Sequence, residues 1–337
     1  ATALPFAKMF GKGGTELEIA QSGWHTTMLI YAIAAVLFFF ITFLSTKERI
    51  KPIAKEKTNI KSDLKDISKN IPWMVLFAIT ILFILFNCIR LNVTTHYFKY
   101  YVGEQSVPWL TDILNFFRGY IINPIISLFG NEKLTVLNRN ETFGFEALTS
   151  IFNTVGQTLS LIGVILVPWF AKTFGRKEAT IILFVTALIC TGSFIFFSPE
   201  NIFLILFFQA IGSITGGPIS ALLWVMYADT ADYSEWKTGR RATGLIFSAS
   251  IMSNKLGWAF GSMIAAFILA STGFVANVTQ NAGTLNGLKS MMSVIPVIPG
   301  LLALTLLIFF YKLDEKTMKK VQEDLNQRRI ESGSSAI

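Results

Sequence analysis

The sequence predicts an all-α integral membrane protein with seven transmembrane helices. Of its 337 residues 52% are hydrophobic and only 15% are charged, whereas an average soluble protein has about 25% charged residues. Apolar stretches of about 20 residues, the length of a helix that crosses a bilayer, recur along the whole chain. One water-soluble core could not bury this material without leaving large exposed hydrophobic patches, so the chain is expected to lie in lipid.

Seven stretches have the length of one span. They lie at about residues 24–44, 71–92, 145–170, 179–197, 202–228, 245–272 and 288–311. Residues 1–10 resemble the end of an earlier span. Within the span at 202–228, Gly216, Gly217 and Pro218 predict a helix kink of the kind found near ligand paths, with tight helix packing as the alternative.

The basic residues predict the orientation of these spans. The connection at 45–70, the turns at 171–178 and 229–244 and the tail at 312–337 fall on one side, which carries most of the Lys and Arg residues. The positive-inside rule places this side and the C-terminus in the cytoplasm, and the N-terminus outside. The net charge of +8 is therefore interpreted as a topology signal, and no nucleic-acid partner is expected.

An insertion at 103–142 is long for a connection between two spans. Its apolar side chains recur at helical spacing, with polar ones on the opposite face. They are Leu110, Ile113, Leu114, Phe117 and Ile121. This pattern predicts a helix in the membrane interface, with Trp109 and Tyr120 as anchors, or alternatively a short lid packed on the outer helix ends.

Two basic residues lie where charge is costly, and both are candidate cation-site or substrate-site residues. Lys255 is about ten residues into its span, roughly 15 Å deep. Gly257 and Gly261 follow it at the spacing that allows close helix approach, so Lys255 is expected to face the bundle interior. An ion pair with an acid on another helix is the alternative. Arg90 lies near a span end, and deeper if its helix continues through residues 97–101.

A third cluster follows the span at 202–228. Asp229, Asp232 and Glu235 repeat at i, i+3 and i+6, so they form an acidic stripe on a helix. Arg240 and Arg241 follow them and suggest ion pairs that latch helix ends at a cytoplasmic gate; a solvated loop is the alternative. The chain offers no nucleophile with a base, no metal ligand set and no phosphate-binding loop, so we do not expect an enzyme.

The block at 227–273 resembles the signature region of the glycoside-pentoside-hexuronide:cation symporters, the melibiose-permease family of the major facilitator superfamily. The matching segments are the ADTADYSE stretch at 228–235, Arg241, GLIFS at 244–248, KLG at 255–257, YFKYYVG at 97–103 after a helix with Arg90, and FGRK at 174–177. The resemblance implies a twelve-helix plan of which the N-terminal helices are missing. Residues 1–44 then end the N-terminal half with helix six, 45–70 form the central loop, and 71–311 form the C-terminal six-helix bundle.

The resemblance also implies a function and its residues. The family members are cation-coupled sugar symporters that work by alternating access, with Na⁺ or H⁺ as co-substrate and no other cofactor. By this resemblance Lys255 lies close to the coupling-cation site, and Asp229, Asp232 and Arg241 belong to the inner gate. Ser250 and Ile251 replace polar groups before the lysine, which argues against melibiose itself.

The expected partners are therefore a sugar or glycoside, a monovalent cation and the lipid of an inner membrane, for a multi-pass protein that works as a monomer. Two alternatives remain at this point. A sodium-coupled lipid carrier resembles the same family, and a seven-helix receptor or retinal photoprotein shares the number of spans and their orientation.

Overall fold

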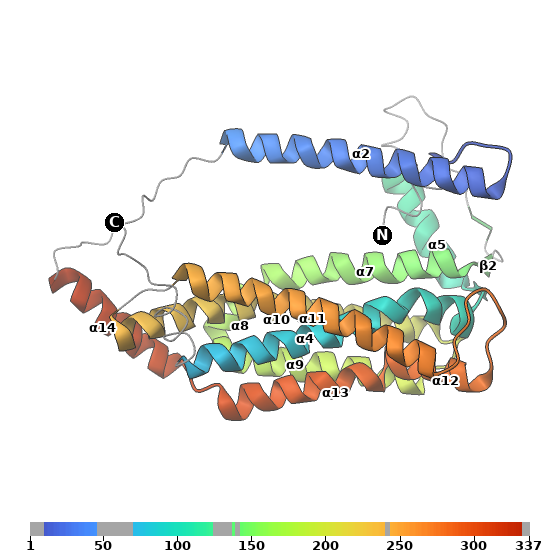
Figure 1. The fold of residues 1–337 in the computed structure, drawn as a ribbon. Coiled ribbons are helices and arrows are strands. Elements are labelled where there is room, and N and C mark those ends of the chain that lie inside the picture. Colours follow the sequence, from blue (N-terminus) through green and yellow to red (C-terminus); the bar gives the residue numbers. More distant parts are fainter. Residues whose placement is uncertain (1–9, 46–69, 124–136, 139–141, 240–242, 332–337) are drawn as a thin grey trace. The chain divides into compact units, whose positions relative to one another are not determined.

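The computed structural model describes residues 10–45, 70–123, 137–138, 142–239 and 243–331 (Figure 1). The chain divides into two compact units, Ala1–Ile60 and Lys61–Ile337. In the first unit α2 (Glu16–Ser45) contains the predicted span at 24–44. It begins early because Thr15 and Glu18 form a capping box: the Glu18 N–H donates to Thr15 Oγ1, and the Thr15 N–H donates to the Glu18 carboxylate.

The second unit is a helix bundle. Its helices are α4 (Ile71–His96) with η1 (Tyr97–Val102), α7 (Phe145–Ile165), α8 (Val167–Phe174), α9 (Arg176–Gly192) with η3 (Ser193–Phe196), α10 (Ile202–Thr238), α11 (Thr243–Ser271), α12 (Ala282–Met292), α13 (Val294–Thr305) with η4 (Leu306–Phe310), and α14 (Glu315–Glu331). α4 packs between α11 and α13, and α10 packs between α7 and α9 (Figure 1). α4 therefore packs against two helices that are distant from it in sequence.

Among the described residues six helices are long and apolar enough to cross a membrane, one fewer than predicted. They include Ile71–Val102, in which α4 continues through η1, and Ile202–Thr238, which is longer than predicted. The span predicted at 245–272 does form α11, which packs along α4. It is not among the six because Ser253, Asn254 and Lys255 make its middle polar.

Proline divides two of the predicted spans. The stretch at 145–170 breaks at Leu166, and α8 then begins at Val167 with Pro168 in its first turn. The stretch at 288–311 breaks at Ser293, between α12 and α13. Pro296 has no N–H to donate to the carbonyl four residues earlier, so one helical hydrogen bond is lost at this point and the break is favoured.

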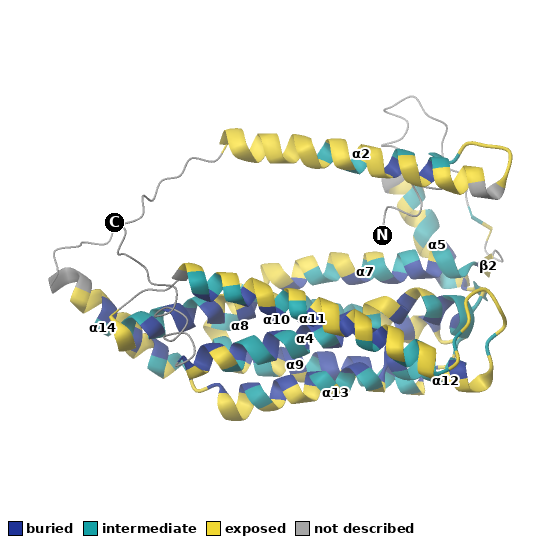
Figure 2. Ribbon diagram, in the orientation of Figure 1, coloured by how far each residue is buried: buried dark blue, intermediate teal, exposed yellow. Residues whose placement is uncertain are grey.

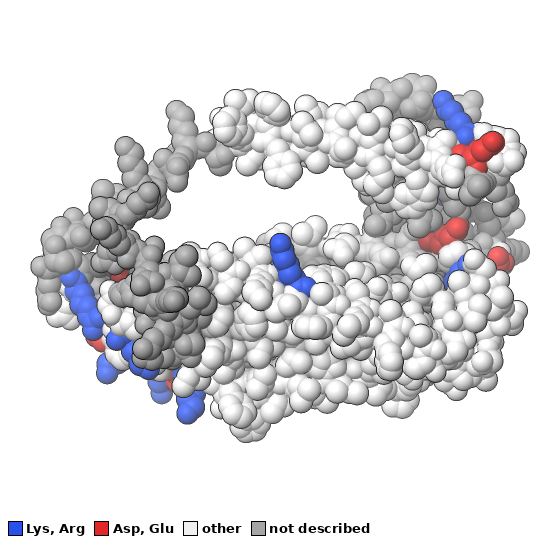
Figure 3. All heavy atoms as spheres, in the orientation of Figure 1, with Lys and Arg blue, Asp and Glu red and all other residues white. Residues whose placement is uncertain are grey.

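The bundle has the surface of a membrane protein. Large apolar side chains such as Phe267 and Phe309 are exposed on its outward faces, whereas Leu76, Ile79 and Phe184 are fully buried inside it (Figure 2). On the face in Figure 3 most charged side chains of the bundle's described residues lie at its two ends, and a basic side chain stands out in the middle. A middle belt with so little charge fits a hydrocarbon environment.

The insertion at 103–142 contains the predicted helix as α5 (Pro108–Phe117), followed by η2 (Arg118–Ile122). Strands β1 (Gln105–Ser106) and β2 (Thr142–Phe143) pair antiparallel and close its base. Val107 and Leu110 are buried in the core at this end of the bundle. The first turn of α5 thus packs on the helix ends, as the lid alternative predicts. Tyr120, one of the two predicted anchors, is exposed.

The core has two parts, and we name the ends of the bundle after them. At the α14 end, Trp73, Met226 and Tyr311 pack with residues of α14. At the β1–β2 end, Phe98, Phe152 and Phe194 form an aromatic cluster. The two candidate sites described below lie at different positions between these two ends of the bundle.

Candidate functional site

A cavity of about 330 Å³ opens within the second unit, between α4, α7, α9, α10 and α11. Its polar lining consists of amides, hydroxyls and one guanidinium: Asn87, Arg90, Thr94, Asn153, Gln157, Ser160, Thr191, Gln209, Ser213 and Ser220. Its aromatic lining consists of Phe83, Phe86, Phe152 and Trp258. Convergent polar groups beside aromatic walls are typical of small-molecule sites, and this cavity is richer in polar groups than most.

Arg90 is the central polar group of this cavity. The continuation of α4 through η1 to Val102 places it well inside the helix, which is the condition under which the sequence predicted a deep arginine. Its guanidinium donates to Thr191 Oγ1 over 3.3 Å and to Gln209 Oε1 over 3.2 Å, and lies 5.1 Å from the centre of the Phe194 ring. Arg90 Nε is buried and has no hydrogen-bond partner among the described residues.

Helical spacing brings the neutral polar groups together. On α4, Asn87, Arg90 and Thr94 lie at i, i+3 and i+7 and therefore share one face. On α7, Asn153 and Ser160 share a face in the same way. Sequence reasoning named Arg90 but missed its neutral neighbours, although polar side chains recurring at helical spacing inside an apolar span were a signal that could have found them.

Small residues allow α7 and α10 to approach closely. A Cβ added to Gly217 would lie 2.4 Å from Ser160 Oγ, and one added to Gly163 would lie 2.2 Å from the Ile214 carbonyl oxygen. α10 itself runs through Gly216, Gly217 and Pro218 without a break. Gly217 therefore fits the alternative of tight helix packing. Both Gly216 and Gly217 also line the cavity.

Lys255 does not face the interior of the bundle, contrary to the prediction. It is exposed on α11, whereas Gly257 and Gly261 pack against Ile84 and Cys88 of α4. Residues two positions apart on a helix are separated by about 200° around its axis. Gly257 therefore lies on nearly the opposite face of α11 from Lys255. The glycine spacing located the packed face correctly and placed the lysine on the wrong side.

Lys255 is nevertheless a helical neighbour of the cavity. Trp258, three residues further along α11, lines it and is 43% exposed. Side chains at i and i+3 lie next to each other on a helix. Lys255 is thus one helical turn from a residue that lines the cavity but does not line it itself, whereas Arg90 does.

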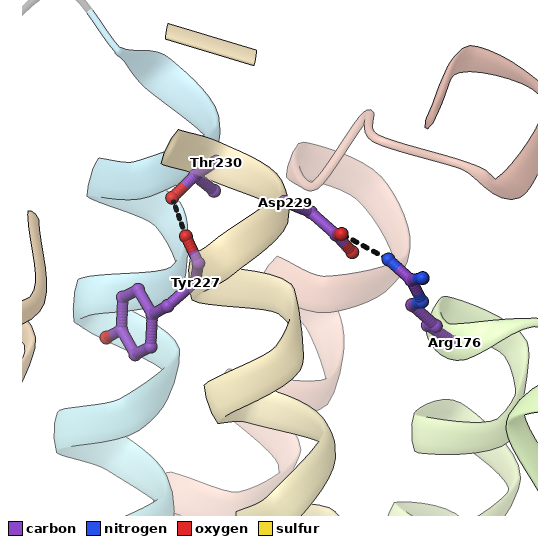
Figure 4. Close-up of polar contacts among 4 residues, drawn as sticks. All are labelled: Arg176, Tyr227, Asp229 and Thr230. Carbon is purple, nitrogen blue, oxygen red and sulfur yellow. Dashed lines mark hydrogen bonds and ion pairs between the residues drawn. The ribbon is translucent and has the colours of Figure 1, made fainter. Parts of the chain in front are cut away.

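The acidic cluster lies at the α14 end. Asp229 of α10 forms an ion pair with Arg176 at the start of α9, and its side chain is only 6% exposed against 30% for Arg176 (Figure 4). Sequence reasoning placed Arg176 in a basic turn but did not name it as the partner. Asp232 and Glu235 are half-buried on the same helix. Arg240 and Arg241 lie outside the described residues, so their pairing stays a prediction.

Neutral hydrogen bonds join α4 and α11 to this region. Thr230 donates to the Tyr227 carbonyl oxygen (Figure 4), and Asn70, the N-cap of α4, donates to the Thr230 carbonyl oxygen over 3.0 Å. The Tyr227 hydroxyl lies 2.8 Å from Thr80 Oγ1 and 3.3 Å from Ser253 Oγ. The helix that carries Asp229 is therefore fixed to two others.

Helix α14 completes this end and was not predicted. Trp236 of α10 donates its indole N–H to Asp324, and Arg328 donates to the Trp236 carbonyl oxygen. Lys177 donates to the Tyr311 carbonyl oxygen over 2.6 Å, at the end of η4. The tail is thus docked on the bundle rather than solvated along its whole length.

Comparisons with known proteins agree on one family. A family model described as "MFS/sugar transport protein" matches residues 1–130 and 113–315. An isoprimeverose transporter of Lactiplantibacillus pentosus is 30% identical over 99% of this chain and 60% of its own length. A glucuronide carrier protein homolog of Escherichia coli is 27% identical over 93% of this chain and 59% of its own length.

The inner membrane symporter YicJ of Escherichia coli is 26% identical over 90% of this chain and 57% of its own length. The chain therefore spans somewhat less than two thirds of the length of the curated relatives that it matches.

Proposed function

This chain belongs to the MFS/sugar transport protein family, and we propose that its protein carries a sugar or glycoside across a membrane by cation-coupled symport. Its family and its apolar helices make it a multi-pass membrane protein. The relatives are named transporters, carriers and symporters, so the receptor and photoprotein alternatives lose their support. The resemblance to the glycoside-pentoside-hexuronide:cation symporters is confirmed at the level of this sugar-symporter family.

The cavity around Arg90 is the observation that carries the proposal. A sugar presents many hydroxyl groups that both donate and accept hydrogen bonds, and the amides of Asn153, Gln157 and Gln209 can do both. A sugar also has an apolar C–H face, which the exposed indole of Trp258 can cover. The combination of several amides, hydroxyls and one indole therefore fits a polyhydroxylated ligand.

The coupling and the gate form the finer part of the proposal. Lys255 lies one helical turn from Trp258, which lines the cavity, and its charge would respond to a cation bound nearby. The ion pair between Arg176 and Asp229 would hold the α14 end closed while the cavity is accessible from the other side. In this scheme the α14 end faces the cytoplasm of an inner membrane, and the ligand and cation shift the populations of two states.

Uptake of labelled sugars into vesicles that contain the whole gene product tests this function. We expect uptake that rises with an inward Na⁺ or H⁺ gradient and falls when an ionophore removes it. Uptake that ignores both gradients would remove the coupling. Lys255→Ala should lower gradient-driven uptake about tenfold, by loss of one charge interaction of roughly 1.4 kcal/mol, whereas Lys316→Ala on α14 should not change it. Normal coupled uptake by Lys255→Ala would remove Lys255 from the mechanism.

A further inference from the structure

Gln209 of α10 meets Arg90 through one atom of its amide. The Arg90 guanidinium donates to Gln209 Oε1 over 3.2 Å. A guanidinium carries only N–H donors and has no acceptor, whereas a glutamine amide ends in one carbonyl oxygen and one NH₂ group. The amide atom that faces Arg90 must therefore be the oxygen, so Arg90 fixes which way round the amide lies.

The nitrogen of this amide points toward α7. A Cβ added to Gly156 of α7 would lie 2.7 Å from Gln209 Nε2 and 3.7 Å from Gln209 Cδ, so the nitrogen is the end of the side chain that comes nearest to Gly156. Gly156 leaves room for the nitrogen because it has no side chain. Both residues line the cavity, and Gln209 is half-buried there. Gln209 therefore presents N–H groups at this part of the cavity wall.

Arg90 imposes the same direction on Thr191 of α9. Its other terminal nitrogen donates to Thr191 Oγ1 over 3.3 Å. A hydroxyl that accepts this bond keeps its own O–H as a donor. Both neighbours of Arg90 thus use an acceptor on the guanidinium and keep their donors. The cavity wall around Arg90 is therefore rich in donors, although each neutral side chain in it could have accepted.

Resting on the proposed function, we propose that Gln209 is a specificity-determining residue: its oriented amide N–H donates to one sugar hydroxyl, which must act there as an acceptor. A hydroxyl group fills this role with a lone pair. A hydrogen atom in its place leaves the amide N–H without a partner, which is costly in a poorly solvated site. Arg90 and Gly156 are positioning residues in this scheme, because one holds the amide oxygen and the other makes room for the nitrogen.

Binding of modified sugars to the purified, detergent-solubilised whole gene product tests the direction of this hydrogen bond. The parent sugars are methyl β-D-glucopyranoside, methyl β-D-galactopyranoside and methyl β-D-xylopyranoside. The parent with the lowest apparent Kd is compared with its monodeoxy and monodeoxyfluoro derivatives, because fluorine can accept a hydrogen bond weakly but cannot donate one, and hydrogen does neither. Ligand-induced stabilisation in thermal unfolding gives each apparent Kd, and uptake of the parents into vesicles is measured in parallel.

One hydroxyl position should respond to the identity of residue 209. In the natural chain, hydrogen at this position should raise the apparent Kd about 3- to 10-fold, and fluorine should raise it less than about threefold. Gln209→Leu should weaken binding of the parent about 3- to 10-fold and abolish the difference at this position alone. Gln209→Glu keeps an acceptor for Arg90 but presents an oxygen to the sugar, so the fluoro derivative should bind at least as weakly as the deoxy one.

Two further variants separate recognition from folding. Gly156→Ala should reproduce the ligand pattern of Gln209→Leu without lowering the unfolding temperature, because its methyl group displaces the flexible end of the Gln209 side chain. Gln322→Leu is the matched control: it makes the same substitution at an exposed position of α14, outside the cavity, and should leave every Kd unchanged.

Three results would overturn the proposal. Equal binding of the deoxy and deoxyfluoro derivatives at every position would show that no hydroxyl serves only as an acceptor. A difference that persists in both Gln209→Leu and Gly156→Ala would remove Gln209 from the recognition. In both cases uptake of a parent sugar would still support the proposed function. The absence of binding and uptake for all three parents would overturn the inference together with the proposed function.

Discussion

Arg176 and Arg90 are arginines of one helix bundle that satisfy their charges in different ways. Arg176, at the α14 end, pairs with the buried carboxylate of Asp229. Arg90, in the cavity, meets only neutral acceptors within the described part of the chain. A paired charge is complete and holds helices together, whereas an unpaired charge in a cavity can still gain from a ligand. The comparison thus separates a structural ion pair from a binding site.

The largest expected effect comes from removing one charge from each region. Asp229→Asn leaves Arg176 without its carboxylate and should lower the free energy of unfolding by about 1 to 3 kcal/mol, because Arg176 is 30% exposed and can be solvated by water. Arg90→Gln removes bonds to neutral groups only and should cost about 1 kcal/mol or less in the absence of ligand. Thermal unfolding of both variants in the same detergent measures the difference. Equal losses would erase the distinction between the two arginines.

A comparable effect tests whether helix packing or the cavity needs the glycines of α10. Gly217→Ala places a methyl group against Ser160 and should destabilise the bundle by about 1 to 3 kcal/mol. Gly216→Ala is the matched control, because no heavy atom lies within 4 Å of its added Cβ. It should be neutral or stabilise the helix by about 0.5 to 1 kcal/mol. A loss of stability in the control would point to helix bending rather than to close contact.

The smallest effect concerns pH at the α14 end. Hydrogen bonds from Thr317 lower the pKa of Asp314, which caps α14, below its ordinary value of 3.8. Because the pKa is lowered, the ionised Asp314 stabilises the helix at pH values above the ordinary pKa of 3.8. This stabilisation is lost as the pH falls through the pKa of the folded state. The exposed position limits the effect to about 0.5 kcal/mol.

Hydrogen exchange of α14, corrected for intrinsic rates, measures this fraying. Exchange should increase below about pH 4 in the natural chain. Asp314→Asn keeps a capping oxygen but cannot titrate, so its exchange should show no such step. A step of the same size in both proteins would assign the pH dependence to another acid.

The sequence predicted the existence of the helices better than their ends or their faces. The length of the apolar stretches alone located the spans, because a helix needs about 20 apolar residues to cross the hydrocarbon core of a bilayer. It could not show that Ser293 interrupts the last span, since apolar residues continue on both sides. The charged tail gave no apolar stripe long enough to suggest α14, whose Met318, Val321 and Leu325 nevertheless enter the core.

For the candidate sites, residue type was predictable and partnership was not. Arg90 stood out because charge in a span is costly, and Asp229 stood out as the first member of an acidic stripe at helical spacing. Arg176 is 53 residues from Asp229 in sequence, and only the packing of α9 on α10 shows that they meet. Gln209 and Thr191 are neutral and looked like ordinary span residues until the fold placed them beside Arg90. Lys255 was assigned to the wrong face because the glycines beside it lie half a turn away.

The length of α4 has a mechanical consequence. Asn70 fastens its first turn to the Thr230 carbonyl next to Asp229, and Arg90 follows 20 residues later, about 30 Å along the axis. A helix whose backbone hydrogen bonds stay intact moves as one element and does not stretch. A tilt of α4 that a ligand causes at Arg90 would therefore also move Asn70. A shift of α4 along its axis by one turn would break the hydrogen bonds of both residues.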